Sequence, residues 1–177
     1  GDFPAVRAAL ESGAVIDCVT YDKMFEVNIV GATPLWLALR NGHFEIAEHL
    51  VRAGADVHRA SQNGCHGAGK CVPLRVAAAF GHAGLGRLLL ERGADPLRDE
   101  WFWGILRAVA EGRRWLGSTG RVGSFADYAE VIRLLLDAGA PLPNPGACGV
   151  LSEIVATGGA PELAERLVPP PDRALPG

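Results

Sequence analysis

A short phrase that ends in Gly-Ala recurs along the 177-residue chain, and it constrains the fold more than any other feature. Its copies are ALESGAV at 9–15, LVRAGAD at 50–56, LLERGAD at 89–95 and LLDAGAP at 135–141. Each copy follows apolar residues at helical spacing, and a glycine such as Gly54 is the residue type that ends a helix. A phrase that returns in this way predicts an array of similar helical units.

A second phrase precedes each helix that the first phrase ends. Its copies are TPLWLALRNGH at 33–43, VPLRVAAAFGH at 72–82, WGILRAVAEGR at 103–113 and, more loosely, VLSEIVATGG at 150–159. Pro34 and Pro73 stand where a helix begins, the position at which proline costs least. Small side chains then allow a second helix to approach closely: Ala38, Ala77, Ala78 and Ala108. We therefore expect each unit to be two short antiparallel helices joined at Gly-His.

These phrases resemble the ankyrin repeat, whose family pattern includes TPLHLAA, GH and a closing GADVN. GATPLWLALRNGHFEIAEHLVRAGADVH at 31–58 is similar to that pattern throughout, and KCVPLRVAAAFGHAGLGRLLLERGAD at 70–95 is nearly as close. The resemblance implies an all-α solenoid of stacked helix-turn-helix units with long finger hairpin loops. Trp36 replaces the family histidine, so we expect it to pack rather than to form the usual hydrogen bonds between repeats.

The resemblance covers almost the whole chain and divides it into an ankyrin repeat domain at 1–168 and a proline-rich tail at 169–177. The expected units have these approximate bounds: 1–30, 31–69, 70–100, 101–146 and 147–168. The last unit lacks TPLH, so we interpret it as a capping repeat. Because the chain starts inside a repeat, we expect it to be a piece of a longer array.

Departures from the regular repeat fall in three places. Long connections at 13–33 and 54–72 enlarge two fingers, and an insert at 113–127 interrupts the turn between the helices of the fourth unit. In the first finger AVIDCV at 14–19 and MFEVNIV at 24–30 are predicted as paired strands, since both are rich in Val and Ile.

The second finger contains HRASQNGCHGAGKC at 58–71, which has the composition of a metal-binding loop. Its possible ligands are His58, Cys65, His66 and Cys71, but their spacing lacks the close pairs of structural zinc sites. We therefore predict no metal, while a metal- or redox-responsive switch and a Cys65–Cys71 disulfide formed by oxidation stay open. The few, scattered cysteines fit reduced thiols in an intracellular protein.

Other function classes find little support in the sequence. With 17 basic and 20 acidic residues, the chain lacks the charge excess that binds nucleic acid. No apolar run reaches the roughly 20 residues that span a bilayer. The glycines of the insert lack the Gly-Lys-Ser/Thr ending of a phosphate-binding loop, and His43 and His82 belong to the Gly-His turns. We expect no enzyme activity and no cofactor.

The resemblance implies that a protein partner binds the concave face, which finger tips and first helices form. Carried over position by position, the expected partner-binding residues are Ile29, Val30, Ala32, Arg40, Asn41, Cys71, Phe80, Asp99, Glu100, Trp101, Phe102 and Glu111. Aromatic side chains within a charged rim are typical of binding hot spots. Trp103 has two open interpretations, because it either packs between units or belongs to this interface.

The sequence thus predicts a monomeric, cytoplasmic, non-catalytic protein-interaction module, a scaffold or adaptor that binds no nucleic acid and no membrane. Two alternatives besides the metal or redox switch stay open. The chain is a regulatory or substrate-targeting segment of a larger enzyme, or the MFEVNIV edge takes up an extended peptide by strand addition.

Overall fold

The computed structural model describes residues 1–19, 31–61, 71–98, 104–116, 123–142 and 145–168. They form helices in this order: α1 (Phe3–Glu11), α2 (Pro34–Arg40), α3 (Phe44–Arg52), α4 (Pro73–Phe80), α5 (Ala83–Glu91), the 3₁₀ turn η1 (Pro96–Arg98), α6 (Gly104–Leu116), α7 (Phe125–Asp137), α8 (Pro145–Thr157) and α9 (Glu162–Arg166). The described part of the chain contains no strand, so the all-α fold class is confirmed.

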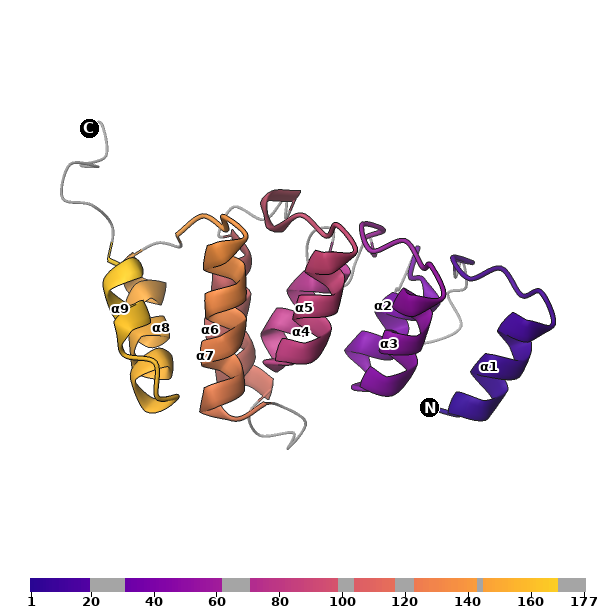
Figure 1. The fold of residues 1–177 in the computed structure, drawn as a ribbon, viewed down its shortest axis with the longest axis horizontal. Coiled ribbons are helices and arrows are strands. Elements are labelled where there is room, and N and C mark those ends of the chain that lie inside the picture. The colour runs from indigo at the N-terminus through magenta and orange to yellow at the C-terminus, as the bar shows by residue number, and fades with distance from the viewer. Residues whose placement is uncertain (20–30, 62–70, 99–103, 117–122, 143–144, 169–177) are drawn as a thin grey trace.

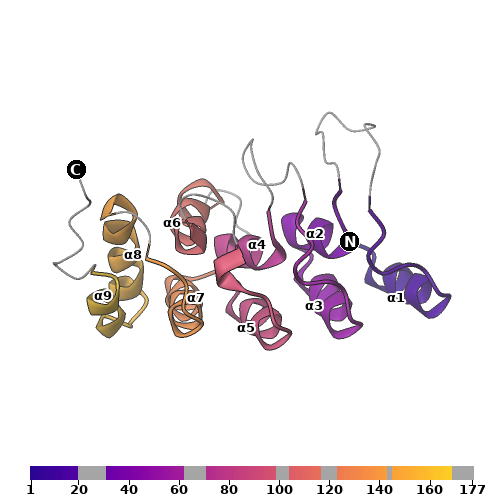
Figure 2. The ribbon, with the colours of Figure 1, turned by 90° about the horizontal axis from the view of Figure 1, so that it is seen from above.

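The helices stand side by side in an elongated stack of two layers (Figure 1). One row contains α2, α4, α6 and α8, and the other contains α1, α3, α5, α7 and α9 (Figure 2). Each helix of the first row packs against the next helix of the same row and against its own partner in the second row. The result is a solenoid in which each unit contacts its neighbours.

Helix ends follow the sequence phrases. Thr33 caps α2, since its Oγ1 accepts a hydrogen bond from the Trp36 amide at 3.2 Å. The glycines of the Gly-Ala phrases all have positive φ, a conformation that side chains with a Cβ disfavour. Their φ values are 91° at Gly13, 97° at Gly54, 87° at Gly93 and 82° at Gly139. The chain therefore reverses direction after each second helix at a glycine, whose backbone adopts positive φ without strain.

The predicted close approach of helices through alanine is confirmed by burial. Ala77 and Ala78 of α4 are 0% and 1% exposed, and Ala38 and Ala108 are 6% and 3% exposed in α2 and α6. Between them lie large apolar side chains such as Leu74 and Ile105, in one continuous core. Trp36 is fully buried, as its expected packing role requires.

The fourth unit is longer than the third, and here the sequence prediction needs correction. We expected residues 113–127 to interrupt only the turn, but the first of them continue α6 to Leu116 and the last of them begin α7 at Phe125. Both helices have 13 residues, whereas α4 has 8 and α5 has 9. Ser124 and Asp127 form a capping box that starts α7 before the family position.

Hydrogen bonds to two backbone carbonyls of α4 fix the longer helix pair against the third unit. The Tyr128 hydroxyl donates a hydrogen bond to the Ala79 carbonyl at 2.7 Å, and the Gly123 amide donates to the Phe80 carbonyl at 2.8 Å. Gly112 lies inside α6 directly against the Ala79 carbonyl. A Cβ on Gly112 would overlap that oxygen, so this contact requires glycine.

The strand predicted at 14–19 is wrong. The Cys18 amide donates to the Val15 carbonyl at 3.2 Å and closes a turn. The Asp17 carboxylate accepts a hydrogen bond from the Asp56 amide at 3.1 Å, which ties this segment to the next unit. The proposed partner strand at 24–30 and the tail at 169–177 lie outside the described residues. At the base of the second finger, Ser61 and Cys71 pair as an isolated antiparallel bridge.

We expect Gly112→Ala to destabilise the protein by about 1–3 kcal/mol, because the added methyl group must displace the Ala79 backbone. Urea denaturation followed by circular dichroism measures the change. Gly149→Ala is the matched control, since Gly149 also lies inside a first-row helix and a Cβ there meets nothing within 4 Å. That control should gain about 0.5–1 kcal/mol, and equal effects of the two substitutions would contradict the close contact.

Candidate protein-interaction surface

We define the first-helix face by four accessible residues on or next to α2 and α6: Arg40, Asn41, Arg107 and Glu111. Arg40 is the last residue of α2 and Asn41 is its C-cap, while Arg107 and Glu111 lie one turn apart on α6 and form an ion pair. The Arg40 guanidinium lies over the Trp36 ring, 5.3 Å from its centroid. Arg40, Asn41 and Glu111 are thus the predicted partner-binding residues that the structure places on an accessible surface.

Arg40 and Trp36 leave polar atoms without partners. The Trp36 Nε1 and the Arg40 Nη1 are both buried and form no hydrogen bond. Stacking on the indole ring compensates for part of the lost solvation of the guanidinium. A buried donor without a partner costs about 1–3 kcal/mol.

Three predicted partner-binding residues are instead part of the core. Ala32 and Cys71 are 0% exposed and Phe80 is 7% exposed, so their side chains do not offer a surface for a partner. Ala32 and Cys71 lie two residues before the first helices α2 and α4 and belong to the continuous core. The Phe80 ring packs edge-on against Phe44 with centroids 5.6 Å apart. Carrying positions over from the family pattern did not predict this burial, because residues of neighbouring units contribute to it.

The remaining predicted partner-binding residues lie outside the described residues: Ile29, Val30, Asp99, Glu100, Trp101 and Phe102. The same holds for Trp103.

Two arginines of the first row were missed by the sequence analysis. Arg75 of α4 is only 5% exposed, and it stands three residues after Val72 just as Trp36 stands three residues after Thr33. Arg107 is paired with Glu111, as noted. The three arginines stand at different positions of their units, seven residues after Thr33, three after Val72 and four after Trp103, so the repeat pattern gives no signal that would have found them.

The possible metal ligands of the second finger are only partly described. The His58 amide donates to the Asp56 carboxylate at 2.8 Å, and Cys71 is disulfide-bonded, which differs from the reduced state that the sequence suggested. Cys65 and His66 lie outside the described residues. Within the described ranges, no three His, Cys, Asp or Glu side chains gather in a way that could hold a metal ion.

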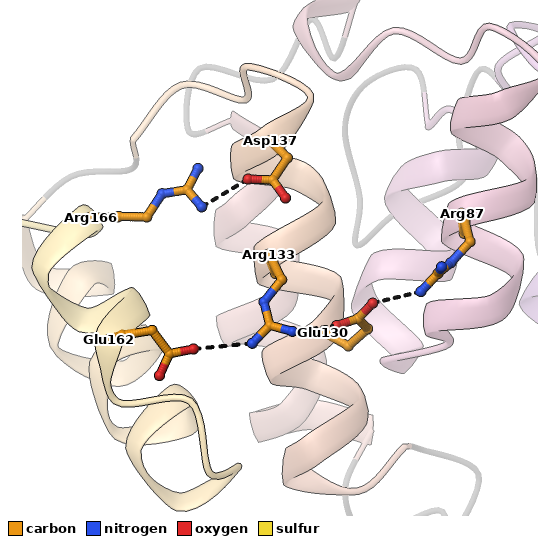
Figure 3. Close-up of polar contacts among 6 residues, drawn as sticks. All are labelled: Arg87, Glu130, Arg133, Asp137, Glu162 and Arg166. Carbon is orange, nitrogen blue, oxygen red and sulfur yellow. Dashed lines mark hydrogen bonds and ion pairs between the residues drawn. The ribbon is translucent and has the colours of Figure 1, made fainter.

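The outer face of the second row is different, because its charges pair with one another (Figure 3). Glu130 of α7 binds Arg87 of α5 at 2.7 Å and Arg133 of its own helix at 3.1 Å. Arg133 continues to Glu162 of α9 at 3.1 Å. Arg166 of α9 binds Asp137 of α7 at 2.8 Å. Three of these four bridges join helices of different units, and the fourth lies within α7.

A pocket of about 280 Å³ opens at the helix-turn end of the units. Its lining residues are Phe44, Phe80, Gly81, His82, Ala83, Gly84, Gly123 and Asp127. The pKa of Asp127 lies below its ordinary value of 3.8, because the Ser124 side chain and then the Ser124 amide donate hydrogen bonds to the carboxylate, and the charge of His82 acts in the same direction. The pocket therefore contains an anionic carboxylate at neutral pH.

The pKa of a thiol elsewhere in the chain is shifted in the opposite direction. Desolvation raises the pKa of Cys148 above its ordinary value of 9.0, so this buried thiol stays protonated and is a poor nucleophile.

Comparison with known proteins agrees with this architecture. A family model described as ankyrin repeats in three copies matches residues 1–100, which is more than half of the chain. The chain therefore belongs to the ankyrin repeat family. Ankyrin repeats are generally protein–protein interaction modules, and domains built from them are typically non-catalytic.

One relative is a protein described as fem-1 homolog CG6966 of Drosophila melanogaster, which is 35% identical over 80 residues. The match covers 44% of this chain and only 12% of that protein. The similarity agrees with the family assignment, and it does not include the rest of the relative's chain. In the described residues, no helix has the length and apolar character needed to cross a membrane.

We expect Glu130→Gln to lower the free energy of unfolding by less than about 1 kcal/mol at low salt, because the bridges to Arg87 and Arg133 are partly exposed. The loss should nearly vanish at about 1 M sodium chloride, which screens such pairs. Urea titration at both salt concentrations measures it, with Glu153→Gln, an exposed residue of α8, as the control. A loss that is independent of salt would contradict an electrostatic origin.

The capping box predicts a pH dependence. A carboxyl group with a depressed folded-state pKa stabilises fully above its unfolded pKa, and its contribution is lost as pH falls through the folded-state pKa. Asp127→Ala should therefore destabilise at neutral pH, and the difference from the wild type should shrink as pH falls below 3.8. Urea titrations across this range test the effect. A difference that stays constant down to strongly acidic pH would exclude the charge as its cause.

Proposed function

We propose that this ankyrin repeat chain binds a protein partner through the first-helix face together with the finger loops. One observation supports this choice above others: Arg40 on the first-helix face forms no ion pair among the described residues, whereas four ion pairs join charged side chains of α5, α7 and α9 on the opposite face. A face whose charges already have partners gains little from a new one. Arg40 is half-buried, and a guanidinium that forms no ion pair gains charge-assisted hydrogen bonds when an acceptor reaches its accessible side.

Arg40 is also well placed as an anchor. Its ring stacking restricts the side chain before any partner binds, so less conformational entropy is lost on docking. Asn41 follows it at the end of α2 and is exposed, and the Arg107–Glu111 pair extends the polar surface to α6. Stacked units hold these groups at fixed spacing, which is how a rigid repeat array selects a partner.

The proposal includes the predicted finger residues Ile29, Val30, Asp99, Glu100, Trp101 and Phe102 as part of the same surface. Cytoplasmic location, a monomeric state, the lack of nucleic-acid binding and the lack of catalysis stay predictions. So do the unit boundaries drawn from the sequence.

Affinity capture from a lysate of the source cells tests the first-helix face. We expect one protein to be retained by the wild-type chain and lost by Arg40→Glu, since the reversed charge repels an acceptor. The control is Glu91→Lys, which reverses an exposed charge at the end of α5 in the opposite row and should retain the protein.

Thermal melting of each variant distinguishes lost binding from lost folding. If Arg40→Glu melts early, Glu111→Lys replaces it on the same face. Equal retention by the wild type and by folded variants of both positions would overturn the role of this face.

A further inference from the structure

The pocket at the helix-turn end exists because the fourth unit is longer than the third. The extra residues of α6 and α7 carry Gly123 and Asp127 past the Gly81–His82 turn of the third unit. The Gly123 amide donates to the Phe80 carbonyl at 2.8 Å, and a Cβ on Gly123 would approach the Gly81 carbonyl to 2.5 Å. The longer pair thus forms a wall beside the turn, fixed by backbone contacts.

Aromatic rings form the floor of this pocket. The Phe44 ring lies 4.3 Å from the His82 ring and 5.6 Å from the Phe80 ring, measured between centroids. Phe44 is only partly buried, so part of its ring faces the pocket. The faces of aromatic rings carry partial negative charge and attract cations.

The charge of the pocket comes from Asp127. Its Oδ2 accepts hydrogen bonds from the Ser124 amide at 2.8 Å and the Ser124 hydroxyl at 2.7 Å. Its Oδ1 has no hydrogen-bond partner among the described residues. The His82 Nδ1 accepts a hydrogen bond from the Leu85 amide at 3.2 Å, so that nitrogen is not available to the carboxylate.

We propose that this pocket binds a single cationic side chain, an arginine of a partner protein, with its guanidinium on the Phe44 ring and against the Asp127 carboxylate. The volume of about 280 Å³ lies at the lower end of ligand pockets, which suits one side chain. An anionic group would meet the Asp127 carboxylate, and the side chains of His82 and Ser124 already accept hydrogen bonds from the Leu85 amide of α5 and the Asp127 amide of α7. An apolar side chain would remove water from the Asp127 carboxylate without replacing the hydrogen bonds that the water donates.

This site is separate from the first-helix face, so the two proposals can fail independently. A small probe tests it without any partner protein. Acetyl-arginine methylamide at millimolar concentration should shift the amide resonances of Ala83, Gly84 and Gly123 in a saturable manner in nitrogen-15 spectra of the full chain. The citrulline analogue has the same shape without the charge, and it should bind about fivefold more weakly or not at all.

Two variants assign the effect to the pocket. Asp127→Asn should weaken the arginine probe by about fivefold, which is the factor expected for loss of an accessible ion pair. Glu153→Gln removes an exposed charge from α8, away from the lining residues, and should leave binding unchanged. Thermal melting confirms that both variants are folded.

Each contrary outcome overturns the proposal. Absence of saturable shifts at these resonances with the wild type would mean that the pocket does not bind a guanidinium. Equal binding of the arginine and citrulline probes would remove the role of charge. Stronger binding of acetyl-glutamate methylamide would show that the pocket prefers an anion.

Discussion

The structure depends on how closely the first-row helices approach one another. Ala77 and Ala78 of α4 and Gly112 of α6 present almost no side chain, so the α6 backbone reaches the Ala79 carbonyl. Dispersion contacts weaken steeply with distance, and a gap of even 1 Å between helices would forfeit much of the packing energy. This contact sets the position of the fourth unit, and through Tyr128 it sets the position of α7 as well.

The two faces of the stack treat charge differently. On the outer face of the second row, the ion pairs of Glu130 and Arg133 connect α5, α7 and α9 (Figure 3). On the first-helix face Arg40 lies on an indole ring and keeps a donor without a partner. One face therefore contributes to cohesion between units, and the other leaves polar groups accessible.

A mismatch between neighbouring units creates the pocket. If α6 and α7 had the length of α4 and α5, Asp127 would not stand beside the third unit's turn. The insert that the sequence marks as irregular therefore contributes two lining residues, Gly123 and Asp127, to this pocket. Repeat proteins acquire individual sites where the period is broken, because regular units expose the same groups everywhere.

Local sequence signals predicted the features that depend on a few residues close together in the chain. Positive φ at the glycines of the Gly-Ala phrases, the Thr33 cap and the two-helix units follow from residues near each turn, so the all-α solenoid was evident. The strand predicted at 14–19 does not form. Asp17 of this segment accepts a hydrogen bond from the Asp56 amide, and a contact with a residue so distant in the chain gives no local sequence signal.

Site residues were harder to predict than the fold. Arg40, Asn41 and Glu111 are accessible as expected, but Phe80 is covered by Phe44 of the preceding unit. Sequence alone determined the helical period and the helix ends, since both are encoded within about ten residues of chain. Only the tertiary structure decided which polar groups pair, which aromatic rings are covered and where a pocket opens, because burial and electrostatics depend on atoms brought from other units.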